Sequence, residues 1–146
     1  MSVRDFVINN GYQFIYADGK VSENPLDTLN VEFSFLRLEN FNLLTAVYGV
    51  EFGGELNGFA KISDIYRTPV FLANMDINTL YVNEENIGNT YILSEWKEDR
   101  KQLYCDLYTL KSNKKELWCK GYYKPEGELL DFNVNINDIN IAFLSL

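Results

Sequence analysis

The chain has 146 residues, a mass of 17.0 kDa and a net charge of −8, which suits one domain and leaves too little chain for two cores. Apolar residues make up 47% of the sequence, enough to form a packed core and to exclude global disorder. The excess of 21 acids over 13 bases argues against broad nucleic-acid binding. No histidine is present, which excludes histidine general bases, histidine-ligated zinc and proximal-histidine haem.

Alternation of apolar and polar residues is the dominant pattern along the chain, and it predicts strands rather than helices. The ranges expected to be strands are 3–8, 12–17, 28–38, 43–52, 55–62, 69–75, 79–83, 90–96, 101–111, 115–123, 128–136 and 139–145. Two or so of these ranges are expected to be wrong, which leaves nine or ten strands. Helix is expected in at most about one-tenth of the residues, with single helical turns at 63–67 and 76–83.

Turn-forming residues separate the expected strands. Three dipeptides supply the positive φ angles of tight hairpins: Asn10-Gly11, Asp18-Gly19 and Gly53-Gly54. Further turns are expected at 84–88, 97–100, 112–114 and 125–127. Strands joined in succession form an antiparallel meander, and about ten of them are expected to close into a barrel or to fold into a two-sheet sandwich. The all-β architecture resembles a calycin-type barrel, although the Gly-x-Trp start of lipocalins is absent.

Compartment and membrane association are judged from the N-terminus, the apolar runs and the cysteines. The first ten residues contain no apolar run of signal-peptide length. The apolar runs at 70–73 and 141–144 are far shorter than a membrane helix. Two cysteines are too few for a disulfide scaffold. We therefore expect a cytoplasmic, single-domain protein (1–146) that does not bind membranes.

Charge is distributed unevenly, and residues 97–124 stand out. This segment holds eight bases and four acids, a net charge of +4, whereas the other residues hold five bases and 17 acids, a net charge of −12. Two interpretations stay open. The lysines protect a sheet edge against aggregation, or they contribute to a site for an anion or a partner.

The same segment forms an amphipathic hairpin when its strands are paired across a three-residue loop at 112–114. Leu107 then lies opposite Cys119 and Cys105 opposite Gly121, which makes one face apolar. The other face collects aromatic and charged side chains. The partner-binding residues predicted on it, with one from the preceding strand, are Tyr91, Tyr104, Tyr108, Trp118, Lys120 and Tyr122.

The preceding strand is placed by a turn at 97–100. This turn puts Leu93 opposite Tyr104 and Tyr91 opposite Asp106. Tyrosine and tryptophan are enriched at interfaces, so the aromatic face predicts a binding surface. The competing interpretation is that cross-strand aromatic pairs merely stiffen an exposed sheet.

Catalytic and metal-binding chemistry has few candidate residues. Cys105 and Cys119 share the apolar face in diagonal positions beyond disulfide reach, so we expect both to be reduced and buried. Two thiols without histidine predict no metal site and no cofactor. Carboxylates are the only acid–base candidates, at Glu51 and Glu55 and in the pair at 84–85. Carboxylates in turns are normally solvated, so we expect no catalytic residues and no enzyme.

These observations predict a non-catalytic binding protein that docks on a protein partner through a sheet face. Acidic inhibitors and antagonists that bind basic surfaces of enzymes are the class that the composition resembles. The alternative is a β-barrel that binds a small molecule, either an apolar ligand or a nucleotide-like anion. The direction of the aromatic side chains distinguishes them: inward around a void favours the small molecule, and outward favours the partner.

Overall fold

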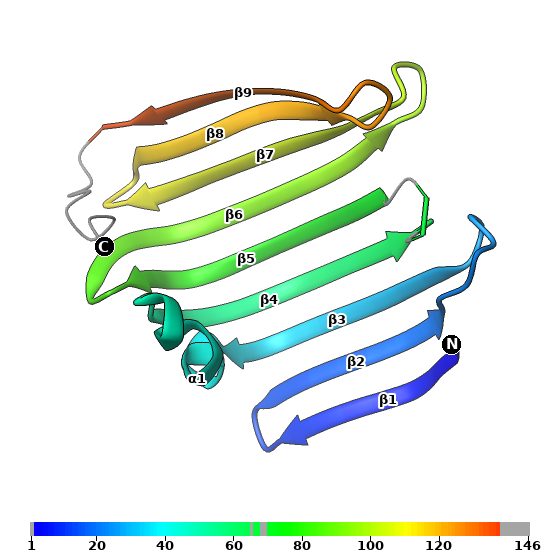
Figure 1. Cartoon of the computed structure of the whole chain (residues 1–146). Coiled ribbons are helices and arrows are strands. Elements are labelled where there is room, and N and C mark those ends of the chain that lie inside the picture. Colours follow the sequence, from blue (N-terminus) through cyan, green and yellow to red (C-terminus); the bar gives the residue numbers. More distant parts are fainter. Residues whose placement is uncertain (1, 65, 68–69, 138–146) are drawn as a thin grey trace.

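A computed structural model describes residues 2–64, 66–67 and 70–137 of the chain. Nine antiparallel strands form one sheet in the order β1-β2-β3-β4-β5-β6-β7-β8-β9, so each strand pairs with its neighbours in sequence (Figure 1). The all-β meander predicted from alternation is therefore confirmed. The strands are β1 (Ser2–Asn10), β2 (Gln13–Lys20), β3 (Thr28–Arg37), β4 (Phe52–Ser63), β5 (Val70–Val82), β6 (Glu85–Lys97), β7 (Gln102–Lys111), β8 (Lys114–Lys124) and β9 (Leu129–Ile136).

The connection between β3 and β4 is helical, which makes the strand predicted at 43–52 wrong. It contains η1 (Leu38–Phe41), α1 (Asn42–Thr45) and η2 (Ala46–Tyr48). The Asn42 side chain holds both backbone groups of Phe52, accepting from its N–H at 2.8 Å and donating to its carbonyl at 3.0 Å. Gly49 then ends the segment with a φ of 70°. These contacts join residues that are ten positions apart in the sequence, and the alternation of apolar and polar residues does not predict them. No helix among the described residues is long and apolar enough to span a membrane.

Several predicted turns and strand ends also differ from the structure. The strands predicted at 69–75 and 79–83 are replaced by the single strand β5 (Val70–Val82), so the helical turn predicted at 76–83 is wrong. Asp18-Gly19 and Gly53-Gly54 lie inside β2 and β4 rather than in turns. Gly54 has a φ of 124°, and the pairing of β4 with β5 shifts register there. Glycine with positive φ thus marks a β-bulge in this chain as well as a turn.

The sheet is open across the described residues. β1 and β9 lie at its two ends and each pairs with one neighbour, β2 and β8 (Figure 1). The closure into a barrel or a sandwich that strand number predicts is not seen in this part of the chain. The strand predicted at 139–145 lies outside the described residues.

Alternate residues divide the sheet into two faces, which we call the polar face and the apolar face. Directly paired residues in neighbouring strands share a face, so the register assigns every paired position. Eleven of the described residues are buried, and eight of them lie on the apolar face: Ala17, Leu36, Ala60, Ala73, Ile77, Thr90, Ser94 and Thr109. The other three, Ile87, Gly88 and Glu116, lie at register shifts. The core is therefore the inner part of one face of a single sheet.

Candidate functional site: an aromatic patch on the polar face

The register of β7 against β8 follows the prediction, but the loop between them does not. Leu107 pairs with Cys119 and Cys105 with Gly121, as expected. The loop has two residues, Ser112 and Asn113, instead of three. Both have positive φ, 50° and 60°, as the tight turns favoured in hairpins require. A register shift between Thr109 and Leu110 compensates for the shorter loop, so the residues of β7 and β8 beyond it pair as predicted.

The register of β6 against β7 corrects the prediction by two residues. Leu93 lies opposite Asp106 rather than Tyr104, and Tyr91 lies opposite Tyr108 rather than Asp106. The turn starts one residue later than expected, because Lys97 still pairs with Gln102. A shift of two residues leaves every side chain on the same face, so the predicted grouping survives.

The six predicted partner-binding residues therefore lie together on the polar face of three adjacent strands. Each of them is half-buried. They form rows across the strands because directly paired residues stand side by side. We call this set the aromatic patch: Tyr91, Tyr104, Tyr108, Trp118, Lys120 and Tyr122.

The first row of the patch is aromatic. Tyr108 stands between Tyr91 and Trp118. The rings of Tyr91 and Tyr108 stack with their centroids 4.9 Å apart and their planes at 20°. The Lys115 ammonium lies 4.4 Å from the Tyr108 ring centroid, within cation–π distance. This row is a rigid, amphipathic surface, since each tyrosine is held by a neighbouring side chain.

The second row carries charge. Lys120 lies opposite Asp106, and its Nζ is 2.9 Å from Asp106 Oδ2. The hydrogen bond to Asp106 raises the pKa of Lys120 above its usual value. The other oxygen, Asp106 Oδ1, is buried with no hydrogen-bond partner. The pair is half-shielded, with the Asp106 side chain 18% exposed and that of Lys120 44% exposed.

The third row pairs Tyr104 with Tyr122. Lys97 Nζ lies 5.9 Å from the Tyr104 ring centroid. The Tyr122 hydroxyl donates a hydrogen bond to Asp131, which raises the pKa of Tyr122. Sequence analysis missed Asp131 as a member of this surface. Its register in β9, opposite Tyr122, follows from the turn at 125–128, whose length the sequence does not specify.

The position of the basic hairpin bears on the interpretation that its lysines protect a sheet edge. β7 pairs with β6 and β8, and β8 pairs with β7 and β9. Neither strand is a sheet edge among the described residues, so edge protection does not explain these lysines. Lys115, beside the patch, instead contacts a tyrosine ring, and Lys120, within it, contacts an aspartate.

The two cysteines are free thiols on the apolar face, in the diagonal positions predicted. The expectation that they are buried is wrong, because both are half-buried. The apolar face over β7 and β8 has no second layer among the described residues. Their partial burial raises the pKa of both thiols. No three histidine, cysteine, aspartate or glutamate residues in the described part of the chain gather into a possible metal site.

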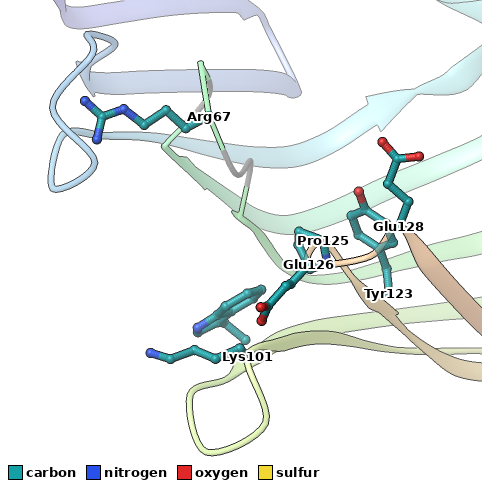
Figure 2. A pocket seen from close by; sticks show the side chains of 7 residues that line it. Arg67, Lys101, Tyr123, Pro125, Glu126 and Glu128 are labelled. Carbon is teal, nitrogen blue, oxygen red and sulfur yellow. The ribbon is translucent and has the colours of Figure 1, made fainter.

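Open hollows lie at both ends of the strands. One hollow, of about 540 Å³, lies at the end that carries the β6–β7 turn (Figure 2). Trp96 and Tyr123 supply its aromatic side chains, and its charged lining residues are Arg67, Lys101, Glu126 and Glu128. Arg67 comes from the β4–β5 connection, and its side chain lies apart from the other labelled side chains and extends away from them (Figure 2). At the opposite end, Glu51 and Glu84 line a hollow of about 280 Å³.

Comparisons with known proteins give no relative for this chain. No family model matches the sequence, and neither the curated proteins nor the solved structures contain a significant match.

Proposed function

We propose that this protein is a non-catalytic binding protein that docks on a protein partner through the aromatic patch. The observation that supports the proposal is the gathering of five aromatic side chains and one ion pair on one face of three adjacent strands. Tyrosine and tryptophan provide large contact area with only two side-chain torsions to order. They are also the residues that most often dominate binding energy.

Charge in and around the patch indicates the chemistry of the partner. Lys97, Lys115 and Lys120 border or enter the aromatic rows, while Asp106 and Asp131 lie between and beside them. A partner surface that offers apolar groups to the rings and carboxylates to the exposed lysines would be complementary. Opposite charges at the rim mainly speed association and fix orientation. Association should therefore slow as salt rises.

A photo-crosslinking experiment tests the proposal. A benzophenone amino acid replaces Tyr91 in one variant and Phe59 in a control variant. Phe59 serves as the control because it lies on the polar face, as Tyr91 does, but in β4, away from the patch. We expect one crosslinked protein from native cells at position 91 and none at position 59. The captured protein is then produced pure, and its affinity for wild type and Trp118→Ala is measured by calorimetry.

The expected loss of affinity for Trp118→Ala is about 2–4 kcal/mol, as for a central interface tryptophan. Phe59→Ala, exposed by 48% on the same face, should bind as wild type. Unchanged affinity in folded Trp118→Ala would mean that the patch is not the site. Loss of folding would mean that the ring belongs to the core.

Small-molecule binding is the second candidate, supported by the hollow of about 540 Å³ with two aromatic side chains and two cations in its lining. A planar ligand would stack on the two rings, and an anionic group on it would have to lie nearer the two cations than Glu126 and Glu128, which also line the hollow. The chain has two tryptophans, so Trp118→Phe isolates the fluorescence of Trp96 in the hollow. Quenching by nucleotides in this variant would support the second candidate, and no change would remove it.

A further inference from the structure

A furrow of small side chains crosses the apolar face from one edge strand to the other. Each residue in it is the direct partner of the next, so the row is continuous: Ala17, Val31, Ala60, Ala73, Ser94, Cys105 and Gly121. The row ends on a phenylalanine at each side, Phe6 in β1 and Phe132 in β9. Such a row has little height, because most of its side chains have at most one heavy atom beyond Cβ.

Large apolar side chains border the furrow on both sides. On the side of the β5–β6 turn, one row of direct partners forms a ridge that Gly58 interrupts between Phe33 and Met75: Ile8, Ile15, Phe33, Met75, Ile92, Leu107, Cys119 and Val134. On the other side lie Leu29, Ile62 and Phe71, and further along Leu103, Tyr123 and Leu130. Neighbouring rows on one face are about 7 Å apart, two residues along a strand. The apolar face is therefore a furrow between ridges.

The apolar face carries no charge along these rows, although the chain has a net charge of −8. The polar face, by contrast, carries acids that include Glu32, Asp76, Asp106 and Asp131. Two copies of the chain would repel each other if their polar faces met. Their apolar faces can meet without opposing like charges.

In the part of the chain that the structure describes, the apolar face is exposed toward both edges of the sheet, whereas its inner residues are buried. Side chains on it are exposed by 49% at Ile8 and 50% at Phe6 in β1, and by 66% at Leu130 and 61% at Val134 in β9. Only six apolar residues of the described chain are buried, and three of them are alanines. Exposed apolar patches of this extent mark interaction surfaces.

The area of the face selects the size of its occupant. Nine strands spaced by about 4.8 Å, each about ten residues long, present a face of roughly 1,300 Å². Two such faces in contact would bury about 2,600 Å², within the range of obligate homodimers. A small ligand fills a pocket of only about 300–1,000 Å³ and would leave most of this face in water.

We propose that the apolar faces of two copies pack together as a homodimer, with the Ile8–Val134 ridge of each copy in the furrow of the other. Stacked sheets pack about 10 Å apart with their strands nearly aligned, so rows that cross the strands are nearly aligned as well. A two-fold axis lying across the strands, midway between furrow and ridge, makes both insertions at once, as a symmetric interface requires. The aromatic patch stays on the outside of this dimer.

Lysine substitutions in β1 test the proposal with a matched control. Ile8 and Val7 are neighbours, both β-branched and both 49% exposed, but Ile8 lies on the apolar face and Val7 on the polar face. Sedimentation equilibrium should give twice 17.0 kDa for wild type and for Val7→Lys. Ile8→Lys should raise the dimer dissociation constant at least about 100-fold, because it buries an unpaired charge. Circular dichroism checks that each variant is folded.

A second pair of variants guards against misfolding of β1. Val134→Lys in β9 should dissociate the dimer, and Asn135→Lys, on the polar face of the same strand, should not. Reaction of Cys105 with a thiol reagent should be slow in wild type and faster in the dissociated variants, since this thiol lies in the furrow. Monomeric wild-type protein at about 100 μM, with or without an apolar ligand seen by native mass spectrometry, would overturn the proposal. So would equal dissociation by both members of a pair, or by neither.

Discussion

On β7, Tyr104, Asp106 and Tyr108 lie on one face and Cys105 and Leu107 on the other, so two surfaces of different chemistry are built from alternate residues of one strand. The polar face here consists of aromatic side chains tied to charges: a stacked tyrosine pair, two lysines over rings and one ion pair. The apolar face consists of uncharged side chains whose small members form a furrow. An exposed polar face is stable in water as it stands, whereas an exposed apolar face gains free energy when it is covered.

Burial and the aromatic patch are on opposite faces of this sheet. All five aromatic side chains of the patch lie on the polar face, whereas eight of the buried residues lie on the apolar face. Truncation on the apolar face should therefore affect stability most, and truncation in the patch should affect local contacts and binding.

The largest effect is expected from truncating the core on the apolar face. Ile77→Ala, at a site 8% exposed, should lower the free energy of unfolding by about 2–5 kcal/mol through the lost burial and the cavity. Leu93→Ala on the polar face, 39% exposed, should cost less than about 1 kcal/mol. Urea denaturation of both variants at one protein concentration measures the difference. Equal losses would contradict the assignment of the core to one face.

The next effect concerns the glycine that ends the furrow. A Cβ at Gly121 would lie 2.1 Å from the Asp131 carbonyl oxygen and 2.7 Å from Phe132 Cα, both backbone atoms of β9. Gly121→Ala should therefore push β9 away and cost about 1–3 kcal/mol. Hydrogen exchange should quicken in β9 before the other strands. Gly11→Ala is the steric control, because no atom lies within 4 Å of its added Cβ, although its positive φ adds some strain.

A smaller effect is expected where Lys115 borders the patch. Lys115→Gln removes the ammonium that lies over the Tyr108 ring, and an exposed cation–π contact contributes about 0.5–1 kcal/mol. A double-mutant cycle with Tyr108→Leu isolates this contribution, measured by denaturation in low salt. A coupling of zero would show that the two side chains do not interact in solution.

The smallest effect is a change of titration. Because its hydrogen bond to Asp131 raises the pKa of Tyr122, Asp131→Asn should lower that pKa toward the ordinary value. A raised pKa in the folded state favours the protonated phenol. The contribution of this bond to stability is therefore complete below the ordinary tyrosine pKa near 10 and is lost as pH rises through the folded value. Carbon-13 NMR of the tyrosine ring follows the titration, and an unchanged pKa in the variant would contradict the bond.

Alternation by itself determined which residues share a face. Tyr91 was assigned to the correct face although its predicted partner in β7 was wrong, because a shift of two residues preserves the parity of a strand. The all-β meander and the grouping of the patch followed from local chemistry for the same reason.

Only the tertiary structure decided the register, the bulges and the helical connection between β3 and β4. The β7–β8 loop has two residues because Ser112 and Asn113 both adopt positive φ and a bulge near Leu110 compensates. The segment after Leu38 turns helical because Asn42 binds the backbone of Phe52. These outcomes depend on pairings between residues distant in sequence. The free energies of such pairings cannot be read from a local sequence pattern. The furrow exists for the same reason: its small residues come from seven strands, and only the register places them in one line.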